Sequence, residues 1–278
     1  MNIVRLKYIL LLLLPVTCFA GEQLVLGVHP YKSPSILIDK FQPLANYLSK
    51  KLSIPVEIRI SKDYELHINS INKNEFDIAY VGPASYVKMT EKTGAKNILA
   101  KQRVKGKASF KGVIIVRQDS KIESLVDLKN QNFAFGDASS TMSHLVPRYM
   151  LIRAGVPIRE LQQHRFYGSH DNVALAVLTG DSDAGAVKEA VYYKYKDRGL
   201  RALKFTPNIS EHLFISTSKM SNKLANDVKY LLLNMNSSNN DEKLIFNSIK
   251  PGIDGFVKAK DSDYENLRDI LKVVNENL

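Results

Sequence analysis

Residues 76–86 read Phe-Asp-Ile-Ala-Tyr-Val-Gly-Pro-Ala-Ser-Tyr, and they indicate the fold class. Six mostly apolar residues predict a short buried strand, which Gly82 and Pro83 break before a helix begins. The same rhythm continues outward: strands are predicted at 24–28, 56–60, 113–116 and 132–135, and helices after Ser33-Pro34 and at 64–74, 145–154 and 172–179. This alternation predicts an α/β fold with mostly parallel sheets covered by helices.

The chain is long enough for two domains, yet no Gly- or Pro-rich linker divides it. Extended segments at 108–116 and 203–216 are the candidate crossings between two lobes. We therefore expect lobe 1 to comprise 21–110 with 212–278, and lobe 2 to comprise 111–211. From Ser221 onward the pattern predicts helices only.

The first twenty residues have the three parts of a secretory signal peptide. Arg5 and Lys7 provide a positive start, 9–14 is an unbroken apolar run, and Cys18-Phe19-Ala20 suits cleavage before Gly21. The alternative of a membrane anchor requires about 20 apolar residues, and this run is shorter. We therefore expect 1–20 to be removed and the mature protein to be soluble in the periplasm.

A second alternative for this segment is a lipoprotein acylated at Cys18. The preceding Pro15-Val16-Thr17 is a poor match to the small residues that lipid attachment uses, so cleavage after Ala20 is favoured. Cys18 is the only cysteine in the chain. Its removal leaves the mature protein without a disulfide, a thiolate nucleophile or a thiolate metal ligand.

The formal charge is +11, and about +9 without Arg5 and Lys7. Such an excess is compatible with nucleic acid, an anionic membrane, a small anion or simply a solvated basic surface. The lysines are scattered among acids and are not interleaved with aromatic residues, which argues against nucleic acid. The sequence also lacks a Gly-x-Ser-x-Gly elbow and metal-ligand spacing between histidines, so we expect neither an enzyme nor a metal or cofactor.

Two segments place a polar helix start directly after a buried strand. In 133–141 the strand stops at Gly136, and Ser139, Ser140 and Thr141 follow. In 166–171 a second strand meets glycine, and His170 lies in the first helical turn. Helix starts offer unpaired N–H groups and partial positive charge, so they bind anions. Ordinary N-capping uses the same residue types and remains an alternative explanation for them. Pro147 either kinks the first of these helices or marks a later start for it.

Together, these landmarks resemble the phosphate, phosphite and phosphonate-binding proteins of ABC importers, the phosphonate-binding type of periplasmic receptor. The resemblance spans the mature chain and rests on 76–86, 137–141, 168–171 with 174–177, 183–186 and 255–257. It implies a type II periplasmic-binding-protein (Venus-flytrap) fold with a two-crossing hinge. It also implies a ligand-binding set: Ser140 and Thr141 in the anion turn, His170 as a donor, Tyr64 from the other lobe, and Glu211 facing an amino group or protonated oxygen.

This sequence departs from the family pattern at several of these positions. Met142 replaces a second serine and Ser143 a glycine, while Phe110 lacks the hydroxyl of a second ligand tyrosine. Ala190 removes another carboxylate, although Glu189 is adjacent. Each lost hydrogen bond to a charged ligand costs about 1.5–3 kcal/mol. The resemblance therefore implies the fold more securely than it implies the ligand.

The expected ligand is a phosphonate, phosphite or phosphate ion held between the lobes. The expected partner is an inner-membrane ABC permease, and we expect the receptor to be a monomer. The alternative function is a periplasmic sensor that signals to a membrane kinase or cyclase, because relatives of this family also occur as sensory modules. Both functions use the same lobe closure and differ in the partner surface.

Overall fold

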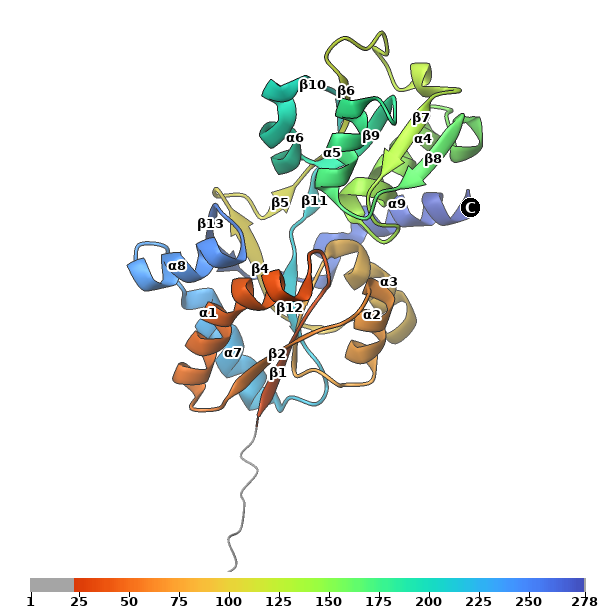
Figure 1. The fold of residues 1–278 in the computed structure, drawn as a ribbon. Coiled ribbons are helices and arrows are strands. Elements are labelled where there is room, and N and C mark those ends of the chain that lie inside the picture. Colours follow the sequence, from red (N-terminus) through yellow and green to blue (C-terminus); the bar gives the residue numbers. More distant parts are fainter. Residues whose placement is uncertain (1–22, 278) are drawn as a thin grey trace, which may run out of the picture.

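Two mixed β-sheets, each covered by helices, form the two halves of the protein (Figure 1). The computed structural model describes residues 23–277, so the predicted leader and its cleavage site lie outside the described residues. In that part of the chain, no helix combines the length and apolar character needed to cross a membrane.

The larger sheet has the strand order β13-β4-β12-β3-β1-β2. Its strands are β1 (Leu24–Val28), β2 (Val56–Ile60), β3 (Ile78–Val81), β4 (Asn97–Val104), β12 (Leu213–Ser216) and β13 (Ile253–Val257). β1 pairs in parallel with β2 and β3, whereas β12 pairs antiparallel with β3 and β4. Its helices are α1 (Pro34–Leu52), α2 (Tyr64–Asn72), α3 (Pro83–Thr93), α7 (Asn222–Asn234) and α8 (Asn240–Ile249). The last helix, α9 (Glu265–Glu276), packs both on α3 and on α4 (Val146–Arg153) and so contacts both halves.

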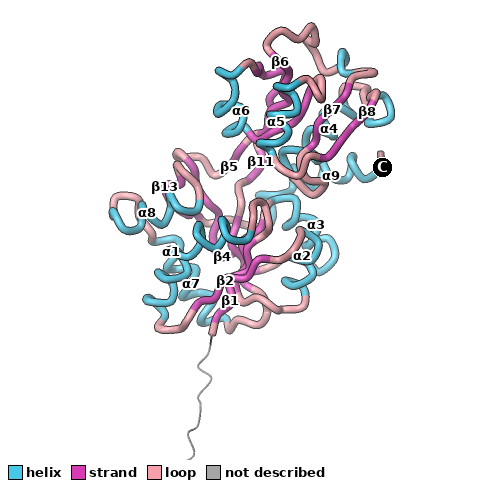
Figure 2. Tube along the Cα trace, in the orientation of Figure 1, coloured by secondary structure: helices cyan, strands magenta, loops and turns pink. Residues whose placement is uncertain are grey.

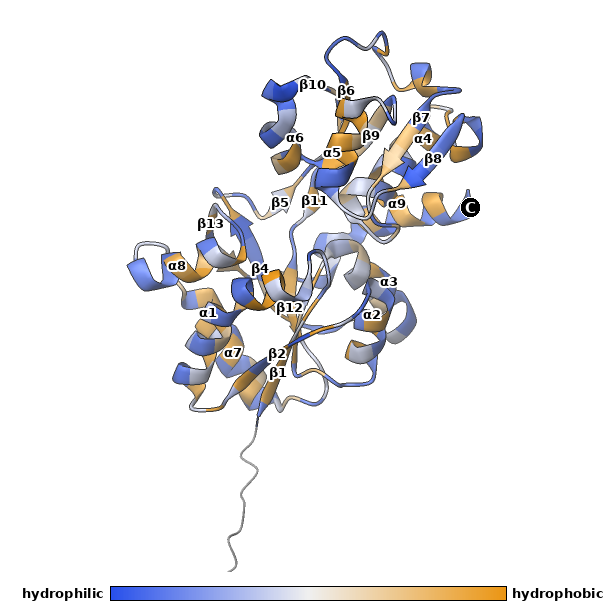
Figure 3. Cartoon of the chain, viewed as in Figure 1, coloured by the Kyte–Doolittle hydropathy of each residue, from blue (hydrophilic) through white to orange (hydrophobic). Residues whose placement is uncertain are grey.

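The smaller sheet has the strand order β10-β6-β9-β7-β8. Its strands are β6 (Gly112–Arg117), β7 (Asn132–Phe135), β8 (Gln163–Phe166), β9 (Ala184–Lys188) and β10 (Leu200–Phe205), and its helices are α4 (Val146–Arg153), α5 (His170–Thr179) and α6 (Glu189–Tyr195). β7 is parallel to β8 and β9, while β6 is antiparallel to β9 and β10. Figure 3 shows β8 as a hydrophilic edge strand beside the more apolar β7.

Two short strands connect the halves. β5 (Ser109–Phe110) and β11 (Ile209–Ser210) pair antiparallel in a separate two-stranded sheet. The chain passes between the halves there as strand and loop, without a helix (Figure 2). These strands lie inside the extended segments 108–116 and 203–216 that were predicted as crossings.

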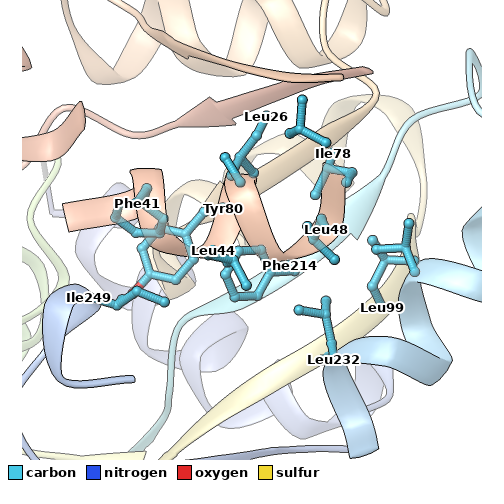
Figure 4. Close-up of a cluster of buried hydrophobic side chains, with 14 of the residues drawn as sticks. Leu26, Phe41, Leu44, Leu48, Ile78, Tyr80, Leu99, Phe214, Leu232 and Ile249 are labelled. Carbon is cyan, nitrogen blue, oxygen red and sulfur yellow. The ribbon is translucent and has the colours of Figure 1, made fainter. Parts of the chain in front are cut away.

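Burial of apolar side chains holds the larger half together. Leu37, Phe41, Leu44 and Leu48 recur at helical spacing on α1, and all are buried against the sheet. Figure 4 shows part of this cluster between α1, the strands and α7, with Tyr80 and Phe214 among its aromatic members. A second cluster spans both halves, because Met142, Leu145 and Val146 pack with residues of α3 and α9.

Two expectations about the fold are wrong. The segment after Ser221 is not only helical, since β13 pairs antiparallel with β4 and buries Ile253 and Phe256. Five residues at a sheet edge give too short a pattern to distinguish from a loop. The sheets are also mixed rather than mostly parallel, because strands that follow a crossing return in the opposite direction.

Candidate functional site

A cavity of about 410 Å³ lies between the two halves and is lined by both. The larger half contributes residues after β1, at the start of α2 and α3, and near β4 and α8. The smaller half contributes the segments after β7 and β8 and the end of β9. Five of the six predicted ligand residues line this cavity: Tyr64, Phe110, Ser140, Thr141 and His170. The structure thus brings together residues that are far apart in the sequence.

Helix starts converge on the cavity from both halves. Ser33 precedes α1, Tyr64 begins α2, Gly82 precedes α3 and Ser169 precedes α5, and each of these residues lines the cavity. The sites lie at the carboxyl ends of strands, where open α/β sheets place their ligands. Each helix start contributes unpaired N–H groups and partial positive charge. The cavity is therefore surrounded by backbone groups that favour an anion.

The turn after β7 presents Ser140 and Thr141. Ser140 accepts a hydrogen bond from the Ser143 backbone N–H (3.1 Å), which is the capping role that remained open from the sequence. Thr141 Oγ1 accepts from the Ala84 N–H of α3 (3.2 Å), a bond between the two halves. The Thr141 hydroxyl hydrogen donates to no acceptor among residues 23–277, so it is available to a ligand.

The helix after this turn begins in two stages because of Pro147. Thr141–Leu145 forms a π-helical turn, η2, and α4 starts at Val146 with Pro147 in its first turn. Pro147 has no N–H to bond to the Ser143 carbonyl, which instead accepts from the Gly136 N–H (3.1 Å). A side chain at Gly136 would collide with Ser143 Oγ at 2.3 Å, so glycine is required at this approach. This interrupted helix leaves Ser140 and Thr141 at the cavity.

His170 occupies the first turn of α5, after Gly168 with its positive φ of 76°. Its Nδ1 accepts from the Lys188 backbone N–H (3.1 Å). That contact leaves the ring proton on Nε2, where the imidazole can donate to a ligand. Burial, with a smaller effect of Lys188, lowers the pKa of His170 to about 3. His170 is therefore a neutral donor at physiological pH.

Tyr64 and Phe110 approach from the other side of the cavity. Tyr64 packs edge-on against His29, with 5.3 Å between ring centroids, and burial raises the pKa of its hydroxyl. The Phe110 ring lies 5.4 Å from that of His212, and Lys250 Nζ lies 5.9 Å from its centroid. Phe110 thus provides an apolar wall where the resemblance leads us to expect a second hydroxyl.

Glu211 is the one predicted ligand residue that does not line the cavity. Its side chain is fully buried, and its oxygens accept from Gln102 Nε2 (2.6 Å), His212 Nδ1 (2.9 Å) and Lys250 Nζ (2.8 Å). Burial by itself would raise the pKa of Glu211, but the His212 hydrogen bond and the Lys250 charge outweigh it and lower the pKa. Glu211 is an ionised anchor behind the wall, and its neighbours face the cavity.

Several cavity residues were not identified from the sequence, among them His29, Tyr31, Lys188 and His212. His29 is 2% exposed, and neither of its ring nitrogens has a hydrogen-bond partner in the described chain. His29 follows β1 directly and Lys188 is the last residue of β9. Both positions are strand ends, which is the sequence signal for ligand groups in an open α/β sheet.

Comparisons with known proteins agree with this architecture. A family model described as the ABC transporter, phosphonate, periplasmic substrate-binding protein matches residues 26–264. The probable ABC transporter phosphite binding protein PhnD1 of Prochlorococcus marinus is 26% identical, over 91% of this chain and 90% of its own length. The phosphate-import protein PhnD of Mycolicibacterium smegmatis is 30% identical over 59% of this chain and 54% of its own.

Solved structures confirm the predicted fold. The crystal structure of Prochlorococcus PhnD1 in complex with methylphosphonate superposes with a TM-score of 0.81 at 24% identity, covering 91% of this chain and 98% of that one. The fold is therefore that of a two-lobed periplasmic binding protein, and the family match favours transport over the sensor alternative. The chain belongs to the family of periplasmic substrate-binding proteins of phosphonate ABC transporters.

Proposed function

We propose that the cavity captures a small phosphorus oxyanion, namely a phosphonate, phosphite or phosphate ion, for delivery to an inner-membrane ABC permease. The observation that carries this proposal is the meeting of Ser140, Thr141, His170 and Tyr64 at one cavity surrounded by helix starts. Hydroxyls, a neutral imidazole and backbone N–H groups suit an oxyanion, because they donate hydrogen bonds without fully cancelling its charge.

We propose a monomer without a catalytic step, whose leader 1–20 is cleaved before Gly21. We also propose that residues 21–110 with 212–278 move as one lobe and 111–211 as the other. The crossing strands β5 and β11 support this division, because short extended segments absorb backbone rotation in hinges.

Calorimetric titration of the leader-free protein tests the ligand assignment. Phosphate, phosphite, methylphosphonate and sulfate are titrated into the wild type, Thr141→Ala and His170→Ala. We expect at least one phosphorus oxyanion to bind to the wild type. Each substitution should make its binding free energy less favourable by about 1.5–3 kcal/mol, which is roughly a ten- to a hundredfold loss of affinity. His164→Ala, on the exposed strand β8, is the matched control and should leave affinity unchanged. Failure of every phosphorus oxyanion to bind the folded wild type would refute the proposal.

A further inference from the structure

Lys188 differs from the other lysines of the cavity because its charge is neither paired nor freely hydrated. Lys40 Nζ donates to the carbonyls of Ser248 (2.9 Å) and Ile249 (3.0 Å), and Lys250 Nζ is paired with Glu211. Lys32 is exposed to solvent. Lys188 lies in the cavity wall, and within residues 23–277 its Nζ forms no hydrogen bond or ion pair.

The position of Lys188 is tied to the predicted anion site. It is the last residue of β9, which pairs in parallel with β7, and the turn bearing Ser140 and Thr141 follows β7. The Lys188 backbone N–H donates to His170 Nδ1. Lys188 and the three predicted donors therefore come from the same edge of the smaller sheet.

The surroundings of Lys188 carry excess positive charge. Burial, together with the charges of Lys250 and Lys32, lowers its pKa to about 8, although Asp171 and Glu211 act in the opposite direction. The cavity-facing histidines beside it are neutral, since burial lowers the pKa of each: His29, His170 and His212. An ammonium in this setting gains most from a ligand that brings negative charge.

Few acidic residues face the cavity, and most of them are already ion-paired. The carboxylates that line it are Asp137 and Asp171. Asp137 Oδ1 accepts from the Ser139 N–H (2.7 Å), while Asp171 accepts from Lys194 and from the Tyr195 hydroxyl (3.0 Å). Glu211 is paired as well, so Asp137 is the one carboxylate of the described cavity wall without a cationic partner, and it lies among several lysines.

We infer that Lys188 is a specificity-determining residue, which ion-pairs with a doubly charged phosphorus oxyanion and disfavours ligands that carry an ammonium group. This inference rests on the proposed function and narrows its ligand class. Met142 and Phe110 lack the hydroxyl donors expected at their positions. The positive charge of Lys188 compensates for these missing hydrogen bonds.

Methylphosphonate and 2-aminoethylphosphonate test this inference, because they share the phosphonate and differ in the ammonium. Titration calorimetry on the wild type should show that methylphosphonate binds more than tenfold more tightly than 2-aminoethylphosphonate. Lys188→Gln should weaken methylphosphonate binding by roughly ten- to a hundredfold, and it should reduce the difference in affinity between the two phosphonates. Lys188→Arg keeps the charge and should keep the preference. Lys204→Gln, an unpaired exposed lysine of β10, is the control for net charge and should behave as wild type.

Proton uptake provides a second readout, which a merely structural role would not change. At pH 9, above the pKa of about 8, the Lys188 side chain of the unliganded protein is mostly a neutral amine, so it must take up a proton to pair with a bound anion. Titrations at pH 9 in two buffers of different ionisation enthalpy should show proton uptake in the wild type and none in Lys188→Gln. If Lys188→Gln does not fold, the wild-type preference and proton uptake decide.

Three results would overturn the inference. These are equal wild-type affinity for the two phosphonates, unchanged affinities in folded Lys188→Gln, or identical proton uptake in both proteins. By contrast, a folded wild type that binds neither these phosphonates nor phosphate or phosphite would overturn the proposed function itself. The two failures are therefore distinguishable.

Discussion

Met142 follows Thr141 at a position where the resemblance leads us to expect a serine, and the structure gives a physical reason for an apolar residue. Its side chain is 1% exposed and packs in the cluster that spans the two halves. The Thr206 hydroxyl contacts its sulfur at 3.6 Å, and the same hydroxyl accepts from the Gly112 N–H (2.8 Å). Met142 therefore contributes packing between the halves.

Met142→Ser should consequently destabilise the protein. We expect the free energy of unfolding to fall by about 2–5 kcal/mol, because the substitution removes buried apolar volume and leaves a cavity. Met142→Leu, which conserves volume, should cost less than about 1.5 kcal/mol. Urea unfolding monitored by circular dichroism measures both values. A Met142→Ser protein as stable as the wild type would show that this packing contributes nothing.

At the scale of elements, the crossing strands are fixed by the buried carboxylate that follows β11. The Glu211 backbone N–H donates to the Ala108 carbonyl (3.0 Å), next to β5, and its carbonyl accepts from the Tyr264 hydroxyl (2.8 Å). Its side chain joins β4, through Gln102, to Lys250 beyond α8. One residue thus ties the crossing strands to three parts of the larger half.

Glu211→Ala should destabilise the protein by about 3–5 kcal/mol, because buried donors lose their acceptor and Lys250 loses its partner. Glu91→Ala, an exposed carboxylate on α3, is the control and should change stability by less than about 0.5 kcal/mol. Guanidinium unfolding of both variants tests the comparison. Equal stabilities would mean that the Glu211 network does not hold the crossing.

For the whole molecule, buried histidines set a pH dependence of stability. His67 and His144 are 0% and 6% exposed, and burial lowers the pKa of each to about 4. Between about pH 4 and pH 6.5 the unfolded chain binds more protons at these residues than the folded protein does. Stability is therefore fully present above about pH 6.5 and is lost as the pH falls.

Each such histidine should contribute a slope of about 1.4 kcal/mol per pH unit in that window. Urea titrations between pH 7 and pH 5 measure the slope. His144→Gln should reduce it by about one histidine's share, while His164→Gln on the exposed strand β8 should leave it unchanged. A wild-type stability that is constant from pH 7 to pH 5 would contradict the prediction.

Local residue patterns were sufficient for most of the elements and for the polar turn after β7. Ser33-Pro34, Gly82-Pro83 and the spacing on α1 depend on capping, backbone geometry and burial of one helix face, all of which act within a few residues. The short edge strand β13 was missed, because its partner β4 lies about 150 residues away. Pairing at that distance leaves little trace in a five-residue pattern.

The composition of the cavity was decided by the tertiary structure. The sequence by itself determined the α/β class and the cavity positions of Ser140, Thr141 and His170, because these residues follow a strand or begin a helix, whereas Tyr64 and Phe110 were expected from the family resemblance. The position of Glu211 behind the cavity wall and the unpaired state of Lys188 could not be predicted from the sequence, since both depend on residues from distant elements. Burial and pairing of a charge are properties of the packed molecule, whereas a helix start is a property of its own few residues.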